Sequence, residues 1–484
     1  MIGDDSPKKK LLRRAATNFV TLTFLLSFHP AGAEHAVDAP LNALMQALHE
    51  QTGVPGLSAA VSVRGELIWH GEVGAADVLA GKPIQQNTVF RLASVSKAVC
   101  SIVAAKLVED GSIDLDDRAG DLLPDLPAHY DSLTMRDLMT HTSGLPHYEA
   151  RDFARGRKNY KSATAGLEQI GDRPLTSPPG TSYVYSTHGF SLAGAMMEQA
   201  SGHTFTTLFE NTVRSSDRYQ TLALESESRR SDQQTQIYEG RRDNKPRVLE
   251  REDFSYSWCG AGMESTATDL SNFSSSIFGS QSLLGKAGLQ LLTQPLPDRN
   301  GETVATERWV MTFGWRRSAD VRGEPYIHHA GVTNGARSIL AIWPKSGLAV
   351  SLLSNASWTG RMEDTAVAFA LAAEGTSVEN GCSNPGMESY QGLFREQPIA
   401  ATIMWEDAAH HCRGRLEGSN ALHEWLSRFN YSGPDGHALV QLDKNWWGLV
   451  TPIGVSILSG DQNRFSGLVG SGELEIMLTE RITK

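Results

Sequence analysis

Cysteine is scarce in this sequence, with four residues in 484: Cys100, Cys259, Cys382 and Cys412. Cys100 falls in an apolar helical pattern, so we expect it to be buried. No histidine and asparagine constellation accompanies it, which excludes a cysteine hydrolase. Cys382 and Cys412 could pair in an oxidising compartment, and the sequence leaves this open. His410 and His411 precede Cys412, but adjacent ligands without a second cluster do not make a metal site. We therefore predict no metal and no cofactor.

An excess of basic residues is also absent, since the formal net charge is −11 at pH 7. Nucleic acid is not expected as a partner, because binding its phosphates requires a positive surface. The apolar run Ala15–Phe28 is too short to span a bilayer comfortably. Stable membrane insertion is therefore not expected either.

The first 33 residues have the pattern of an export signal. A basic segment, Lys8–Arg14, precedes the apolar run, and Ala31-Gly32-Ala33 fits a small-x-small cleavage site. We predict a signal peptide at 1–33, cleaved after Ala33, and a periplasmic or secreted protein. An uncleaved membrane anchor is the alternative. Removing the net charge of +3 of this segment from the total of −11 leaves −14 for residues 34–484.

Ser94 and Lys97 form a Ser-x-x-Lys pattern at the start of an amphipathic run, Val95–Glu109. Residues three apart share one face of a helix, so the hydroxyl and the amine lie one turn apart. Apolar neighbours desolvate Lys97 and favour its neutral form, which can accept a proton from Ser94. The helix N-terminus also favours a developing oxyanion. Such a pair provides a serine nucleophile without a catalytic histidine, although single matches such as Ser6–Lys9 are common.

Tyr185 is the second candidate. It follows a turn formed by two prolines and Gly180, and an apolar helical pattern begins near Phe190, so Tyr185 lies on a loop that enters a helix. A phenol beside a cation can transfer protons, since the cation favours the phenolate. The alternative is an aromatic ring that only packs. Two residues later, Thr187 could donate a hydrogen bond to a substrate carbonyl.

Two segments compete as the strand beside the nucleophile. Lys345-Ser346-Gly347 lies between two apolar runs, which predicts a hairpin turn rather than a site. The segment from His329 to Val332 follows a strand-like stretch, and we choose it. Gly331 would let the strand approach the acyl carbon, and the Val332 amide would complete an oxyanion hole with that of Ser94. His329 would face the acidic end of the substrate.

Three further strings accompany these motifs: Phe90-Arg91-Leu92-Ala93, Leu133–Pro146 and Gly260–Leu270. These strings and the motifs above occur along about residues 40 to 375 in the order that is typical of one superfamily. The chain resembles the serine β-lactamase and penicillin-recognising superfamily. The branch it resembles is that of class C β-lactamases, D-alanyl-D-alanine peptidases, β-lactamase-fold esterases and the mitochondrial β-lactamase-like protease. The resemblance implies an α+β fold, with an antiparallel β-sheet flanked by helices and an all-helical subdomain. It also implies an acyl-enzyme on Ser94.

Departures from the family pattern limit what the resemblance implies. Thr187 stands where the family most often has asparagine, and His329 and Ala330 replace its lysine and its serine or threonine. A histidine offers less fixed positive charge than a lysine. We therefore expect an exported serine hydrolase acting on a peptide, amide or ester bond of a small-molecule or peptide substrate. The alternatives are a penicillin-recognising sensor that acylates without turnover, a true β-lactamase and an inactive scaffold.

The pattern of apolar runs and turns predicts three segments after residue 33. They are a hydrolase domain at 34–375, a linker at 376–385 and a small β-rich C-terminal domain at 386–484. In the hydrolase domain we expect one antiparallel sheet and a last helix, Met362–Ala373. The C-terminal domain could support a homo-oligomer through its tryptophans. The expected sheet strands are Leu57–Val63, Glu66–Val73, Glu324–His328, Arg337–Trp343 and Leu348–Leu353, and the tryptophans are Trp405, Trp425, Trp446 and Trp447.

Overall fold

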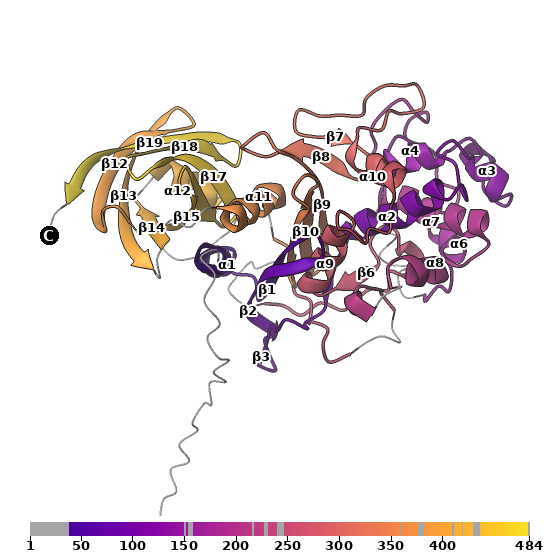
Figure 1. The fold of residues 1–484 in the computed structure, drawn as a ribbon, viewed down its shortest axis with the longest axis horizontal. Helices are drawn as coiled ribbons and strands as arrows, with labels where there is room; N and C mark the ends of the chain where they lie inside the picture. The colour runs from indigo at the N-terminus through magenta and orange to yellow at the C-terminus, as the bar shows by residue number, and fades with distance from the viewer. Residues whose placement is uncertain are drawn as a thin grey trace, which may run out of the picture. The chain divides into compact units, whose positions relative to one another are not determined.

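The computed structural model describes residues 38–149, 152, 158–214, 217–226, 231–239, 246–358, 360–375, 382–408, 411–418, 420–428 and 436–482. The predicted signal peptide and residues 376–381 of the predicted linker lie outside the described residues. From Ala36 to Lys484 the chain clusters as one unit. This unit contains a large sheet with its helices, followed by a β-barrel (Figure 1).

An eight-stranded antiparallel sheet lies at the centre of the first part, in the order β3-β2-β1-β11-β10-β9-β8-β7. Gly65 and Gly347 take left-handed backbone conformations in the tight turns after β1 and β10, where glycine is favoured. The predicted strands and the last helix are confirmed. The short strands β8 and β7 after β9, and β3 at the other edge, extend the sheet beyond what the apolar pattern predicts. The strands are β1 (Gly56–Val63), β2 (Glu66–Asp77), β3 (Lys82–Pro83), β7 (Val310–Met311), β8 (Arg316–Ala319), β9 (Pro325–Thr333), β10 (Ala336–Trp343) and β11 (Leu348–Ser354).

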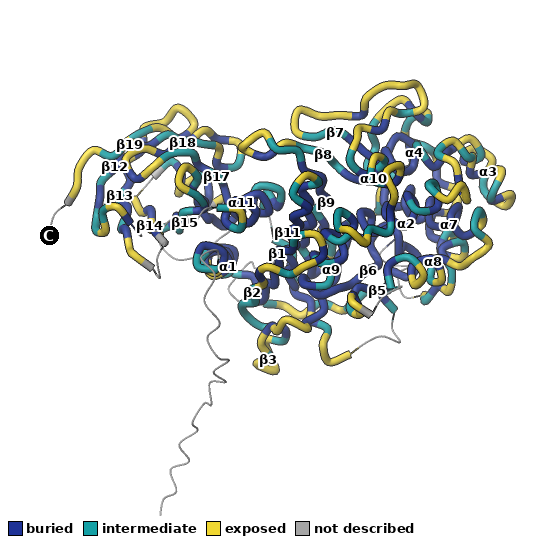
Figure 2. Tube along the Cα trace, viewed as in Figure 1, coloured by how far each residue is buried: buried dark blue, intermediate teal, exposed yellow. Residues whose placement is uncertain are grey.

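Helices cover both faces of this sheet, which explains why its central strands are almost continuously apolar. On one face, α1 (Asp38–Thr52) and α11 (Met362–Glu374) share a core with Ala59 of β1. On the other face, α2 (Val95–Glu109) and α9 (Ala267–Ser276) share a second core with Ala60. Adjacent residues of one strand thus enter different cores, because side chains alternate across a strand. The central strands and α2 are accordingly buried (Figure 2).

The helical part begins at a small sheet of β4 (Phe90–Arg91), β6 (Met263–Ser265) and β5 (Ala223–Leu224), which leads into α2. Thr134 caps a short helix, α4 (Met135–Met139): its side chain accepts from the Asp137 amide, and the Asp137 side chain accepts from the Thr134 amide in return. Among the described residues, no helix is both long and apolar enough to cross a membrane. The remaining helices are α3 (Ala119–Leu122), α6 (Ala163–Gly166), α7 (Thr187–Ser201), α8 (Phe205–Thr212) and α10 (Lys286–Thr293).

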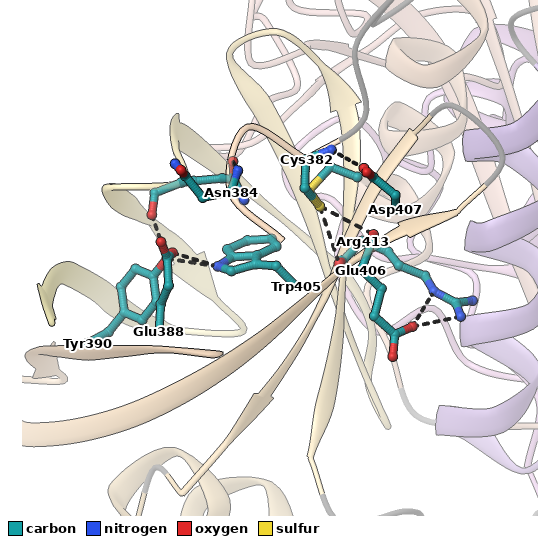
Figure 3. Close-up of a disulfide and its surroundings, with 10 residues drawn as sticks. Cys382, Asn384, Glu388, Tyr390, Trp405, Glu406, Asp407 and Arg413 are labelled. Atoms are coloured by element: carbon teal, nitrogen blue, oxygen red, sulfur yellow. Dashed lines mark hydrogen bonds and ion pairs between the residues drawn. A yellow bond between two sulfur atoms is a disulfide. The ribbon is translucent and has the colours of Figure 1, made fainter. Parts of the chain in front are cut away.

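The β-rich tail forms a closed eight-stranded barrel. Its interior is filled by aromatic side chains, including Trp405 and Trp447, whose ring centroids lie 5.2 Å apart. Figure 3 shows the disulfide that joins Cys382 to Cys412, which confirms the pairing that the sequence left open. The strands are β12 (Gly386–Phe394), β13 (Gln397–Ala408), β14 (His411–Glu417), β15 (His437–Asp443), β16 (Trp446–Thr451), β17 (Gly454–Asp461), β18 (Arg464–Val469) and β19 (Gly472–Ile482), with α12 (Asn420–Ser427) between β14 and β15.

The barrel also shares a core with the sheet-and-helix part. Val440 and Val455 of the barrel belong to the same apolar cluster as α1 and α11, and the Arg361 amide donates to the Ile453 carbonyl. The expectation that four tryptophans form an available apolar surface is wrong for Trp405 and Trp447. Both are buried inside the barrel, because a barrel of this size needs large side chains to fill it.

Candidate active site

Ser94 lies at the junction between β4 and α2, at the N-cap position of the helix. Ala93, the residue before it, is fully buried and has φ +48°, a left-handed conformation that is uncommon for alanine. This conformation turns the chain sharply between strand and helix. Backbone strain of this kind costs on the order of 1–3 kcal/mol and is often found at functional sites. The nucleophile candidate is thus held at a helix N-terminus, where partial positive charge favours an oxyanion.

Lys97 lies one helical turn further on and its side chain is fully buried. Its Nζ is 3.2 Å from Ser94 Oγ, 2.9 Å from Thr187 Oγ1 and 2.7 Å from the Gly260 carbonyl oxygen. Burial lowers the pKa of Lys97 well below its ordinary value, and the nearby charge of Arg316 lowers it further. The amine therefore loses its proton at a pH well below the pKa of a free lysine, and it can act as a base toward Ser94.

Tyr185 faces the same amine, with Lys97 Nζ 4.8 Å from the centre of its ring. Burial raises its pKa to about 12, although the hydroxyl of Ser94 and the charge of Arg316 act in the opposite direction. The expectation that a neighbouring cation favours the phenolate is therefore wrong for the resting site, because desolvation outweighs the cation. Tyr185 is a protonated phenol, suited to donating a proton.

Two histidines hold the loop that carries Tyr185 and Thr187. The Ser186 amide donates to His141 Nδ1 at 3.2 Å, and the Thr187 amide donates to His147 Nδ1 at 3.2 Å. Both rings also contact the ring of Tyr185, with centroid distances of 4.5 and 5.1 Å. The end of the Leu133–Pro146 string therefore lies beside Tyr185.

His329 lies on β9 and is buried. Its Nδ1 donates to the Ala330 carbonyl at 2.8 Å. Burial lowers the pKa of His329 well below its ordinary value, and the charge of Arg316 adds to this effect. The imidazole is therefore neutral at pH 7 and presents a hydrogen-bond acceptor, Nε2, instead of a charge.

The fixed positive charge comes from Arg316, which the sequence analysis missed. Arg316 begins β8, and its guanidinium lies 5.6 Å from the ring centre of Tyr185 and 5.3 Å from that of Trp309. It also donates to the Tyr183 hydroxyl at 3.3 Å. Burial alone would lower the pKa of Arg316, but Tyr183 and Tyr185 raise it. Its only sequence signal is a basic residue on a short strand ahead of β9.

Gly331 lies directly against the nucleophile. A Cβ atom at this position would be 3.1 Å from the Ser94 amide nitrogen, 2.5 Å from the Leu92 carbonyl oxygen and 2.3 Å from Ser338 Oγ. Only glycine allows β9 to come this close. Val332 follows on the same strand, with 55% of its surface exposed. The contribution of its amide to an oxyanion hole stays a prediction.

Lys345, the competing candidate, lies on the turn between β10 and β11. Its side chain is 77% exposed and forms a 2.8 Å ion pair with Glu324. The Gly347 amide closes the turn on the Trp343 carbonyl. This confirms the hairpin turn that the flanking apolar runs predict. The literal Lys-Ser-Gly match is therefore structural.

A second disulfide, between Cys100 and Cys259, lies beneath the site. The expected burial of Cys100 is confirmed, but its pairing is not indicated by the sequence, in which the two cysteines lie 159 positions apart. No cluster of three or more metal-ligating side chains occurs within the ranges that the structure describes.

A buried Ser-x-x-Lys pair beneath a tyrosine, with an antiparallel strand against the serine amide, is the arrangement of a serine acyl-transfer site. A comparison with protein families agrees with this class, because the family model named Beta-lactamase matches residues 41–374. The chain belongs to this family of β-lactamase-fold serine hydrolases.

Individual relatives are more distant. The mitochondrial serine beta-lactamase-like protein LACTB of Bos taurus is 25% identical over 454 residues, which cover 71% of this chain and 80% of that protein. Esterase EstB of Burkholderia gladioli is 31% identical over 180 residues, 32% of this chain and 43% of that protein. The structure of the octameric penicillin-binding protein homologue from Pyrococcus abyssi matches with a TM-score of 0.58 at 17% identity, covering 90% of this chain and 99% of that one. The similarity of fold thus extends into the barrel.

Proposed function

We propose that this protein is an exported serine hydrolase that cleaves a peptide, amide or ester bond through an acyl-enzyme on Ser94. The observation that carries the proposal is the 3.2 Å contact between Ser94 Oγ and the Nζ of a fully buried Lys97. A lysine in this environment loses its proton well below its ordinary pKa and can act as a base, and the Ser94 side chain makes no capping hydrogen bond to the helix that it precedes.

The first half of the reaction forms the acyl-enzyme. Lys97 takes the Ser94 proton while Oγ attacks the acyl carbon, and the carbonyl electron pair moves onto oxygen between the amides of Ser94 and Val332. The tetrahedral intermediate then expels the leaving group, which takes its proton from the Tyr185 hydroxyl. Lys97 returns its proton to Tyr185. In the second half, water attacks the ester carbon and the same groups act in reverse order.

Arg316 defines the substrate class that fits this site. It is the permanent cation next to Tyr185, and a guanidinium pairs with a carboxylate in a two-point geometry. The neutral His329 beside it offers an acceptor for a substrate N–H group. We therefore favour an acyl donor that carries an anionic group near an amide or ester bond, such as a short peptide.

Export is part of this proposal. Its support is the leader pattern at residues 1–33 together with two disulfides, Cys100–Cys259 and Cys382–Cys412, since disulfides persist in oxidising compartments. Fractionation of cells that express the protein tests it: the expected product is in the periplasm or medium and begins after Ala33. A full-length cytoplasmic product would contradict export without affecting the hydrolase assignment.

The acyl-enzyme is tested with a fluorophosphonate probe that labels activated serines. Wild type is expected to label, Ser94→Ala not at all, and Ser112→Ala, an exposed serine past the end of α2, like wild type. Labelling of Ser94→Ala would refute the proposal. Turnover of p-nitrophenyl esters and short peptides then separates a hydrolase from a sensor, which would show one burst of product and no steady rate.

A further inference from the structure

The turn from Ser257 to Gly262 is folded tightly beneath the catalytic helix. Three successive amides, those of Gly260, Ala261 and Gly262, donate to the single carbonyl of Ser257 at 2.8 to 3.0 Å. A Cβ atom on Gly260 would lie 2.4 Å from Thr187 Cγ2 and 3.0 Å from the Thr187 carbonyl oxygen. The turn is thus packed against the loop that carries Thr187, with its Gly260 carbonyl directed at Lys97.

Three links join this turn and the residue after it to positions 96, 97 and 100 of α2. The Met263 amide donates to Ser96 Oγ at 3.1 Å, Lys97 Nζ donates to the Gly260 carbonyl at 2.7 Å, and Cys259 is bonded to Cys100. The disulfide is the only covalent link of the three. It joins the residue directly before Gly260 to a position one turn beyond Lys97.

The Gly260 carbonyl has a specific effect on the amine. A neutral lysine has two N–H donors and one lone pair, and Nζ has three partners here. The carbonyl can only accept, so it always takes one N–H. The Thr187 hydroxyl takes the other when it accepts from Nζ. The lone pair is then left facing Ser94 Oγ, which is the orientation that proton abstraction requires.

We propose that the Cys100–Cys259 disulfide is a positioning element for catalysis, because it holds the Gly260 carbonyl where it orients the Lys97 lone pair toward Ser94. This inference rests on the proposed function. Gly194 on α7 leaves room for the bond, because a Cβ atom built there would already be 3.4 Å from Cys259 Sγ. Without the bond, only hydrogen bonds and packing would hold the turn against α2, and we expect it to shift by tenths of an ångström while the fold remains.

The test compares two double variants. Cys100→Ala/Cys259→Ala lacks the disulfide beneath the active site, and Cys382→Ala/Cys412→Ala lacks the disulfide of the barrel. Both are assayed by the second-order rate constant of fluorophosphonate labelling from pH 5 to 10, well below their melting temperatures. We expect the Cys100/Cys259 variant to label about 10- to 100-fold more slowly. Its rising pH limb should move to higher pH, since a looser turn admits water to Lys97. The barrel variant should match wild type in both respects.

A wild-type rate and pH profile in the Cys100/Cys259 variant would overturn the inference. If that variant does not fold, Cys100→Val/Cys259→Ala restores side-chain volume without the bond and carries the same expectation. A second route uses the barrel variant, in which Cys100–Cys259 is the remaining disulfide. A dithiol such as dithiothreitol transfers two electrons and two protons to that bond, giving two thiols and the cyclic oxidised dithiol. A thiol count confirms that the bond is reduced. If labelling is then unchanged, the inference is likewise overturned.

The two proposals fail separately. If Lys97→Ala abolishes labelling while the disulfide variants label like wild type, Lys97 is the base and the disulfide is structural. If Lys97→Ala labels like wild type, the proposed function fails, and an effect of the disulfide on the rate would have to act by another route.

Discussion

Two of the buried polar clusters among the described residues, one in the barrel and one at the active site, are built in opposite ways. In the barrel, the Glu388 carboxylate accepts from Tyr390 at 2.7 Å, from Trp405 at 2.9 Å and from the Arg481 guanidinium at 3.0 Å. At the active site, the hydrogen-bond partners of Lys97 among the described residues are all neutral, and the nearest charge that acts on it is the like charge of Arg316. In the barrel cluster an acidic and a basic side chain are paired, whereas Lys97 has no acidic partner among the described residues.

This difference separates structure from chemistry. A buried charge with an opposite partner and satisfied hydrogen bonds stays ionised and holds its neighbours in place. A buried amine without such a partner favours its neutral form and is available to accept a proton. Figure 3 shows the Glu388 carboxylate of the barrel cluster beside Tyr390 and Trp405. We read the barrel cluster as a stabilising element and the Lys97 cluster as the catalytic one.

The largest expected effect separates the two clusters directly. Lys97→Ala should reduce acylation about 10²- to 10⁴-fold, the contribution of a positioned general base. Glu388→Gln should leave the acylation rate within about twofold of wild type and reduce the free energy of unfolding by about 1–3 kcal/mol, because it weakens a buried hydrogen-bond network. Labelling kinetics and urea unfolding of both variants measure this. A Glu388 variant that is stable but inactive would contradict the assignment.

A smaller effect concerns the source of positive charge. Arg316→Gln should lower kcat/KM for substrates with a carboxylate about 10- to 100-fold, through loss of a charge-assisted pair, and should affect neutral esters much less. Lys345→Gln is the matched control, since Lys345 lies on a distant exposed turn, and it should change neither. The assignment of Arg316 fails if the two ester types lose activity equally, because the residue would then act on Tyr185 rather than on the substrate.

The smallest effect concerns a buried histidine on the opposite side of β9 from the catalytic residues. Burial lowers the pKa of His328 to about 4, from an ordinary value of 6.5. The folded pKa is below the unfolded one, so the neutral imidazole contributes stability above pH 6.5, and this is lost as pH falls toward 4. Between pH 7 and 5 the loss amounts to about 2 kcal/mol. Urea unfolding at pH 7 and pH 5 measures this, and the free energy of unfolding of His328→Gln should fall by about 2 kcal/mol less than that of wild type. If both proteins lose the same amount, other groups cause the pH dependence.

The sequence predicts those parts of the site that depend on local spacing. Ser94 and Lys97 are one helical turn apart, and Tyr185 follows a turn that its prolines and glycine specify. The structural role of Lys345 also follows from local pattern, because two apolar runs flank it. These features need no knowledge of which distant segments meet.

The remaining parts depend on tertiary contacts. Arg316 reaches the site only through the pairing of a four-residue strand with β9, and Cys259 meets Cys100 only because a tight turn packs under α2. The neutral state of His329 and the high pKa of Tyr185 follow from burial, which motifs do not report. The closed barrel likewise appears in the sequence only as short β-like runs, since closure depends on the pairing of its first and last strands.

The most direct test of the central claim is the pH dependence of Ser94 labelling in wild type, with Tyr185→Phe as a parallel sample that keeps Lys97. We predict that the rate rises with an apparent pKa well below that of a free lysine, about 10.4, because Lys97 loses its proton at a lower pH in its buried environment without an opposite charge. The same limb should appear in Tyr185→Phe at a lower rate. A rate that rises only near pH 10, or that does not depend on pH, would contradict the claim that a neutral Lys97 activates the serine.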